Sequence, residues 1–219
     1  MRRLILAEFL GTALLLVSVV GSGIMGESLA NGNVAITLLA NAIATGCMLY
    51  CIITLFGPVS GAHFNPIVTL AFLVRGKMAP LTALRFVVAQ VVGGICGVWL
   101  VHVMFDQPIL QLSQTARTGV NLWSSEIFAS FGLLLVIFGG LAHNKRSIPA
   151  MVGLYITSAY WFTSSTSFAN PAVSIARSLS DSFSGILPAH VPMFIICQLI
   201  GLALALCALS LLFPKLLQN

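Results

Sequence analysis

Two Asn-Pro pairs, Asn65-Pro66 and Asn170-Pro171, are the most distinctive chemical feature of this sequence. Asn caps the first turn of a helix and Pro fits at its first position, so each pair favours a helix start. The apolar run after each pair is too short to cross the roughly 30 Å of a bilayer core. The sequence therefore predicts two half-helices, at residues 66–75 and 171–179, whose positive N-terminal ends point inward.

Each half-helix is preceded by a short segment that we expect to enter the membrane as an extended strand, at residues 60–64 and 166–169. Irregular backbone at membrane depth is tolerated where it is buried or lines a water-filled path. Free carbonyls of these segments would then serve as acceptors along a narrow path, and the amides of Asn65 and Asn170 would serve as donors at its centre. This pattern is typical of a pore for neutral hydroxylated solutes, and the two positive helix ends would oppose cations and protons.

Glu8 and Glu126 are the only acidic residues within long apolar segments. Carboxylates inside a membrane are candidates for functional groups, including proton relays. The alternative is that each accepts hydrogen bonds from backbone N–H groups of one re-entrant segment. We expect this bracing role, because the two acids occupy matching places in the two halves of the chain.

Two further polar residues flank the Asn-Pro pairs. His63 precedes Asn65 by two residues, and we expect it to line the cytoplasmic half of the pore. Arg177 follows Val173 by four residues, which is one helical turn. Arg177 either places a cation in the outer mouth, or extends to the headgroups or to Asp181.

The composition of the whole chain indicates the class of protein that holds these groups in position. Of the 219 residues, 58% are hydrophobic and 7% are charged, whereas about a quarter are charged in soluble domains. The mean hydropathy of +1.04 agrees with an integral membrane protein. Six apolar stretches are long enough to span a bilayer. They cover residues 4–25, 35–56, 81–105, 123–141, 148–165 and 193–213.

The chain also repeats. Glu8, Asn65-Pro66 and Gln90 in the first half are answered in the same order by Glu126, Asn170-Pro171 and Gln198. Three spans per half reverse the orientation of the second copy. We therefore predict an all-α membrane protein of one domain, residues 1–219, with inverted repeats at 1–105 and 122–219 joined by an extracellular loop at 106–121.

The positive-inside rule gives the orientation of the predicted spans. With a cytoplasmic N-terminus, eight of the ten Lys and Arg residues are cytoplasmic. These are Arg2, Arg3, Arg75, Lys77, Arg85, Lys145, Arg146 and Lys215. We expect a multi-pass protein of the cell (inner) membrane with both termini in the cytoplasm.

Gln90 and Gln198 each open a Gln-x-x-Gly motif, which ends at Gly93 and Gly201. Together with the two Asn-Pro motifs and the two glutamates, these motifs resemble the aquaporin, or major intrinsic protein, family. The resemblance implies a passive channel with six spans and two half-helices, one pore per subunit and a homotetramer. It also implies that Asn65, Pro66, Ile67, Asn170, Pro171 and Ala172 form the central motifs. Ile67 replaces the usual Ala, and we expect it to alter half-helix packing or narrow the pore.

A second departure lies directly after the second motif, where Val173 replaces the family's usual Arg. The resemblance assigns the rest of the selectivity filter to one residue on the second span, one on the fifth and one in the second re-entrant segment. Counting from the motifs gives the following ring: Thr45, Ser158, Ser167 and Val173. A slip of one residue would substitute Ala44 or Gly46 for Thr45, and Thr157 or Ala159 for Ser158.

A ring without a cation or a large aromatic side chain is wide and uncharged. It resembles a small bacterial subgroup of the family associated with arsenical permeation. We therefore expect passage of arsenite, methylated arsenicals, glycerol and some water across the lipid bilayer. The alternatives are an ordinary water or glycerol facilitator, a proton-coupled transporter that uses Glu8 or Glu126, and a membrane scaffold. The sequence predicts no enzyme, no cofactor, no metal site and no nucleic-acid partner.

Overall fold

The computed structural model describes residues 1–214 and is helical, without strands in that range. Lys215, which the charge pattern assigns to the cytoplasm, lies outside the described residues. Five helices of the described part are long and apolar enough to cross a membrane. They are α1 (Arg2–Leu29), α2 (Val34–Ser60), α4 (Pro80–Met104), α5 (Val120–His143) and α8 (Val191–Leu212), the last preceded by the 3₁₀ turn η2 (Pro188–His190).

The fifth predicted span corresponds to α6 (Ile148–Phe162), which has 15 residues and follows the 3₁₀ turn η1 (Lys145–Ser147) directly. This helix is shorter than the predicted 148–165 because Thr163 adopts an extended backbone conformation. The Thr163 hydroxyl then donates to the Ala159 carbonyl and satisfies an acceptor of the last turn. Ending α6 here leaves residues 163–170 free to turn back into the bundle.

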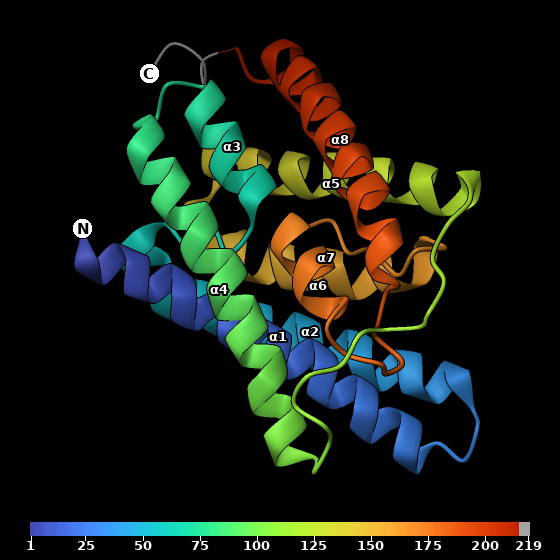
Figure 1. The fold of residues 1–219 in the computed structure, drawn as a ribbon. Coiled ribbons are helices and arrows are strands. Elements are labelled where there is room, and N and C mark those ends of the chain that lie inside the picture. The colour runs from blue at the N-terminus through green and yellow to red at the C-terminus, as the bar shows by residue number, and fades with distance from the viewer. Residues whose placement is uncertain (215–219) are drawn as a thin grey trace.

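The two predicted half-helices are α3 (Pro66–Val74) and α7 (Pro171–Arg177), and both lie among the long helices (Figure 1). The Asn65 side chain caps α3 by accepting from the Ile67 N–H at 3.0 Å. The Asn170 side chain caps α7 by accepting from the Ala172 N–H at 3.0 Å. Each half-helix therefore begins where the Asn-Pro spacing predicts.

The two halves follow one order of elements: α1, α2, α3 and α4 are matched in order by α5, α6, α7 and α8, with the half-helix third in each half. In the first half, α4 crosses α1 closely because Gly93 and Gly97 face the backbone of Phe9 and Ala13. In the second half, α8 crosses α5 in the same manner. A Cβ atom added at Gly201 would lie 2.5 Å from the Ile127 carbonyl oxygen. A side chain at these glycines would separate the helices. The two halves therefore match in their order of elements and in their close helix crossings.

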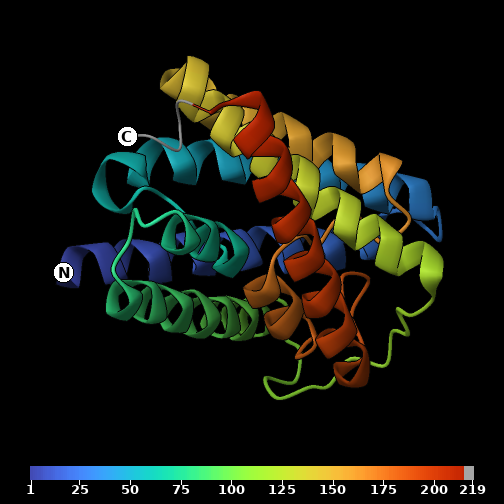
Figure 2. The ribbon, with the colours of Figure 1, turned by 90° about the horizontal axis from the view of Figure 1, so that it is seen from above.

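The linker between α4 and α5 runs across one end of the molecule, beside the segment that follows α7 (Figure 2). The Ser113 N–H donates to the Ser178 carbonyl at 3.0 Å, and the Leu187 N–H donates to the Thr115 carbonyl at 2.8 Å. Arg117 adds side-chain hydrogen bonds to the Gly185 and Phe183 carbonyls at 2.7 and 3.2 Å. The linker thereby covers the end of the second half.

The prediction of two extended entry strands is wrong in its backbone conformation. The first segment is shorter, because α2 continues through Ser60 and ends at Gly61 with φ +93°. Ala62 and Phe64 then have positive φ, as do Thr166, Ser167 and Ala169 in the second segment. Non-glycine residues in this region cost about 1–2 kcal/mol each. Both segments are tightly turned, so other contacts must hold them.

Candidate functional site

The two re-entrant segments are joined to each other at the centre of the fold. The Asn65 Nδ2 donates to the Ala169 carbonyl at 2.8 Å, and the Asn170 Nδ2 donates to the Phe64 carbonyl at 2.8 Å. Each amide nitrogen carries two protons, so one donor of each remains after this exchange. Both Asn side chains also border the cavity described below. The remaining donors can serve a solute there.

Glu8 holds the first re-entrant segment through hydrogen bonds to its carboxylate. The carboxylate accepts from the His63 N–H at 3.0 Å, the Phe64 N–H at 2.7 Å and the Ser60 hydroxyl at 2.6 Å. Gln90 of α4 adds a fourth donor at 2.7 Å. These bonds satisfy backbone donors that would otherwise be buried without partners, and they fix the left-handed turn.

Glu126 holds the second segment with the same set of donors. Its carboxylate accepts from the Phe168 N–H at 2.9 Å, the Ala169 N–H at 2.9 Å and the Ser165 hydroxyl at 2.6 Å. Gln198 of α8 is the fourth donor, at 2.7 Å. Both glutamates are fully buried. Their contacts support the bracing role that we expect for both acids.

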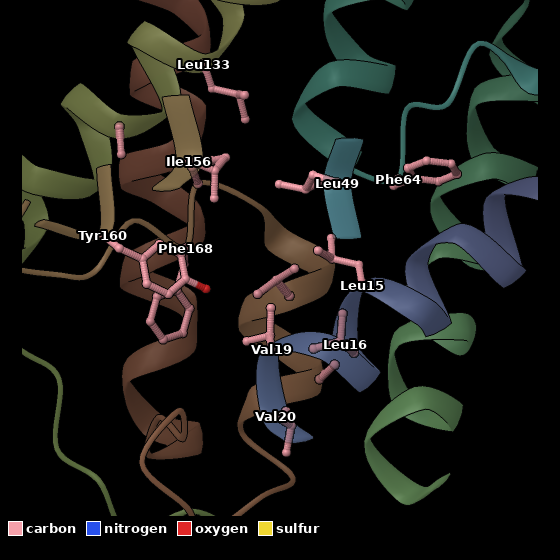
Figure 3. Close-up of a cluster of buried hydrophobic side chains, with 14 of the residues drawn as sticks. Leu15, Leu16, Val19, Val20, Leu49, Phe64, Leu133, Ile156, Tyr160 and Phe168 are labelled. Atoms are coloured by element: carbon pink, nitrogen blue, oxygen red, sulfur yellow. The ribbon is translucent and has the colours of Figure 1, made fainter. Parts of the chain in front are cut away.

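A cavity of about 110 Å³ lies between the long helices and both half-helices. Figure 3 shows part of its wall, where Leu15 of α1, Leu49 of α2 and Ile156 of α6 lie around the same space. Most of the wall is apolar, and its polar side chains are few. They are Thr45, His63, Asn65, Tyr160, Ser167, Asn170 and Arg177.

Comparison with known proteins identifies the family that has this geometry. The family profile of the major intrinsic protein matches residues 1–167. The chain belongs to the major intrinsic protein family. It is 50% identical over 206 residues to the aquaglyceroporin AqpS of Rhizobium meliloti, which covers 94% of this chain and 87% of the relative. It is 30% identical over 231 residues to human aquaporin-5, covering 96% and 81% of the two chains.

A solved structure agrees on the fold. The X-ray structure of the aquaglyceroporin from Plasmodium falciparum superposes with a TM-score of 0.73 at 19% identity, covering 99% of this chain and 98% of that one. The chain is therefore a multi-pass membrane protein with the aquaporin fold. As a member of the major intrinsic protein family it is a channel rather than an enzyme, and it passes small solutes passively.

Three of the four residues expected in the filter of this aquaporin border the cavity: Thr45, Ser167 and Val173. Ser158 does not, and the expectation for this position is corrected. Its side chain is exposed on the outside of α6 and its hydroxyl donates to the Leu154 carbonyl at 2.9 Å. The alternatives Thr157 and Ala159 are likewise absent from the wall. Counting along the sequence misjudged which face of α6 points inward.

Tyr160 is the α6 residue that borders the cavity near Thr45, and its hydroxyl lies 3.3 Å from the Thr45 hydroxyl. Val152, Ile156 and Tyr160 recur every four residues, so they share one face of the helix. This spacing was readable in the sequence and would have identified the aromatic residue. Phe168 also lies in the wall, so the expected absence of large aromatic side chains is wrong.

Arg177 is buried, with 1% of its surface exposed, and it borders the cavity. Its guanidinium carbon lies 3.4 Å from the centre of the Phe168 ring, and its Nε donates to the Ser184 carbonyl. The side chain therefore does not extend to the surface. Of the two alternatives for this residue, the structure favours a cation that faces the pore.

His63 borders the opposite part of the cavity, stacked on Phe72 with ring centres 4.6 Å apart. Its Nδ1 lies 3.1 Å from the Thr69 hydroxyl. Ile67, by contrast, is fully buried among α5 and α8 side chains such as Leu134 and Leu202, away from the cavity wall. Ile67 therefore packs the half-helix against α5 and α8, and it does not narrow the cavity.

Proposed function

We propose that this channel conducts small uncharged solutes, including metalloid hydroxides such as arsenite, methylated arsenicals and polyols such as glycerol, with some water. The observation that carries the proposal is the position of Val173. This side chain borders the cavity directly after the second Asn-Pro-Ala motif and leaves no guanidinium there. A Val at this point fixes no hydrogen-bond donors and adds no charge, so solutes larger than water are accepted.

The chemistry of the wall supports hydroxylated neutral solutes. Asn65 and Asn170 each present a donor at the centre, and apolar side chains make up most of the remaining surface. A polyol or a metalloid hydroxide exchanges part of its hydration shell for these donors while its carbon or metalloid centre contacts the apolar wall. An inorganic cation loses hydration without recovering acceptors and meets the charge of Arg177.

The printed name of the relative AqpS, an aquaglyceroporin, supports passage of glycerol. An ordinary water or glycerol facilitator is therefore the second candidate, and it differs from the first in excluding arsenite. We also propose that the channel resides in the inner membrane as a homotetramer, with both termini cytoplasmic. The bias of Lys and Arg toward one side supports this orientation.

A proton-coupled transporter is the candidate of another class. Glu8 and Glu126 each accept four hydrogen bonds, from two backbone N–H groups, a serine and a glutamine. Neither of them is among the residues that border the cavity within the described chain. This saturation favours a passive channel, because a proton relay needs an acid that meets the solute or water path. Accumulation against a gradient that an uncoupler abolishes would instead support the transporter.

The test is solute uptake in proteoliposomes that hold the native chain, Val173→Arg or Val173→Thr. Native vesicles should pass glycerol and arsenite in a non-saturating manner. Val173→Arg should slow both at least about tenfold, equivalent to about 1.4 kcal/mol in the barrier, and retain water flux. Val173→Thr keeps the size of Val and should behave as the native channel. A native channel that passes water rapidly and excludes glycerol and arsenite would disprove the proposal.

A further inference from the structure

The outer face of α2 carries two cysteines one helical turn apart, Cys47 and Cys51, which we call the thiol pair. Both residues are exposed and neither forms a disulfide, so they are not part of the packed core. Thr45 and Leu49 precede them by two residues each, which places them on the opposite side of the helix, and both border the cavity. The thiol pair therefore lies outside the pore.

A groove of about 520 Å³ lies at the thiol pair, between α2 and α6. The two helices meet closely there, because a Cβ atom added at Gly46 would lie 2.8 Å from the Gly153 carbonyl oxygen. The hydroxyl of Thr157, which also lines the groove, already donates to the Gly153 carbonyl at 2.9 Å. Most of the remaining wall is apolar. The groove thus offers two thiols and an apolar surface beside them.

Two common uses of a thiol pair do not fit this geometry. Side chains one helical turn apart have Cβ atoms about 5–6 Å from each other, whereas a disulfide needs about 3.5–4.5 Å. A structural zinc ion takes four ligands, and no group of three or more His, Cys, Asp and Glu side chains that could hold a metal ion occurs within residues 1–214. The groove suits a thiophilic centre that needs two sulfur ligands and carries an apolar substituent.

We infer that Cys47 and Cys51 form a bidentate binding site for monosubstituted trivalent arsenicals, R–As(OH)2. Each thiol replaces one hydroxyl group on arsenic, so two As–O bonds break and two As–S bonds form. The two thiol protons leave with the hydroxyl groups as two water molecules. Arsenic stays trivalent, so the step needs no oxidant or reductant. The carbon substituent remains on arsenic and contacts the apolar wall near Ile43 and Leu154.

This site goes beyond the proposed function, because neither cysteine is among the residues that border the cavity. A chain that conducts neither glycerol nor arsenite would still bind the arsenical in the groove. After the first As–S bond forms, the second thiol reacts within the same molecule at a high effective concentration. The thiol pair therefore retains the arsenical in the presence of free monothiols, whereas a single cysteine does not.

The probe is phenylarsine oxide, which in water is phenylarsonous acid. Native protein in proteoliposomes is treated with an equimolar amount of the probe in excess glutathione, and its intact mass is then measured. We expect one phenylarsenic group per chain that resists glutathione and is removed by 2,3-dimercaptopropanol, since only a dithiol competes with two As–S bonds. An adduct that glutathione removes, or no adduct, would overturn the inference.

Variants locate the site. Cys47→Ser and Cys51→Ser each leave one thiol in the groove, and each should lower the glutathione-resistant adduct at least about tenfold. Cys207→Ser makes the same change at an exposed cysteine of α8 that has Ala203 and Leu211 one turn away. This control should keep the adduct within about 1.2-fold of native. Any other pattern among the three variants would place the arsenical elsewhere and overturn the inference.

A rescue variant tests the spacing. Ile43 lines the same groove one turn before Cys47. Ile43→Cys combined with Cys51→Ser again places two thiols a turn apart and should restore at least about half of the native adduct. A folded double variant, shown by its melting temperature in detergent, that forms no resistant adduct would contradict the bidentate site.

A comparison of two states of the native chain needs no variant. The protein in proteoliposomes and the chain denatured in dodecyl sulfate are labelled under the same conditions. Because the groove is open and the helix holds the thiols a turn apart, the folded protein should form at least as much glutathione-resistant adduct as the denatured chain. Labelling of the denatured chain alone would show that the groove is closed to the arsenical and would overturn the inference.

Discussion

The two re-entrant segments share one hydrogen-bonding scheme and differ in the side chains that they turn toward the cavity. Counting from each Asn, Ser60 corresponds to Ser165 and Thr69 to Ser174, and both pairs make matching hydrogen bonds. At the next matching pair of positions the two halves have side chains of different chemistry. His63 stacks on Phe72 in the first half, whereas Phe168 stacks on Arg177 in the second.

This difference shows which constraints the halves have in common. Each turn buries backbone N–H groups that need acceptors, so a glutamate, a serine and a glutamine are required in both. The stacked pairs contact the cavity and contribute little to that backbone scheme. They are therefore free to differ, and they place an imidazole in one half of the pore and a guanidinium in the other.

Packing behind the two turns differs in a compensating manner. The Phe64 ring occupies the space where a side chain at Gly11 of α1 would stand. The matching positions of the second half hold Ala169 and Ala129, and both are fully buried. A large residue with a small partner in one half is replaced by two residues of equal, small size in the other.

The largest effect should come from removing either glutamate. Glu8→Ala and Glu126→Ala each leave four donors without an acceptor, at about 1–3 kcal/mol per donor. We expect each variant to lose at least about 4 kcal/mol and most of its folded yield, measured by the melting temperature in detergent. Equal losses would support equivalent braces. A variant that folds normally but shows altered dependence on a proton gradient would contradict the bracing role.

A smaller loss is expected from Gly11→Ala, because the added methyl group meets the Phe64 ring. Overpacking of this kind costs about 1–3 kcal/mol. In the background of Phe64→Ala the same change should cost less than about 0.5 kcal/mol, since coupled neighbours are not additive. Ala129→Gly is the comparison variant, because it exchanges the same two residue types at the matching position of the second half without the clash against the Phe64 ring. Equal costs of Gly11→Ala in both backgrounds would argue against the large–small exchange.

Arg177→Phe makes the second half resemble the first and tests whether the cation matters to selectivity. Removing one charge about 10 Å from a passing ion at an effective dielectric constant of about 20 changes its barrier by about 1.7 kcal/mol. Proton leak into vesicles, followed with a pH-sensitive dye, should rise about twentyfold while glycerol flux stays within about threefold of native. An unchanged leak would assign cation rejection to the half-helix ends alone.

The smallest effect should come from Ser158→Ala. The Ser158 hydroxyl bonds to its own helix and lies outside the wall, so stability should stay within about 0.5 kcal/mol and flux should not change. Tyr160→Phe is the matched change on the inner face and removes the partner of the Thr45 hydroxyl. A change of solute preference in Ser158→Ala would restore that residue to the filter.

Much of the fold was predictable because it depends on local chemistry. Asn-Pro fixes where a helix begins, a bilayer fixes how long a span must be, and an acid in an apolar segment needs donors. The start of α3 at Pro66 and of α7 at Pro171 followed directly from these rules. The left-handed turns did not, because Ala62, Phe64 and Ala169 have no intrinsic preference for them.

By itself, the sequence determined the membrane class, the two half-helices, the paired glutamates and the absence of Arg directly after the second motif. These features follow from residue type and from spacing within one segment. Only the tertiary structure decided that Tyr160 rather than Ser158 faces the cavity and that Arg177 lies buried against Phe168. The face that a helix turns inward depends on the helices packed around it, and a cation is retained in a pore wall only where an aromatic face and a carbonyl from distant segments meet it.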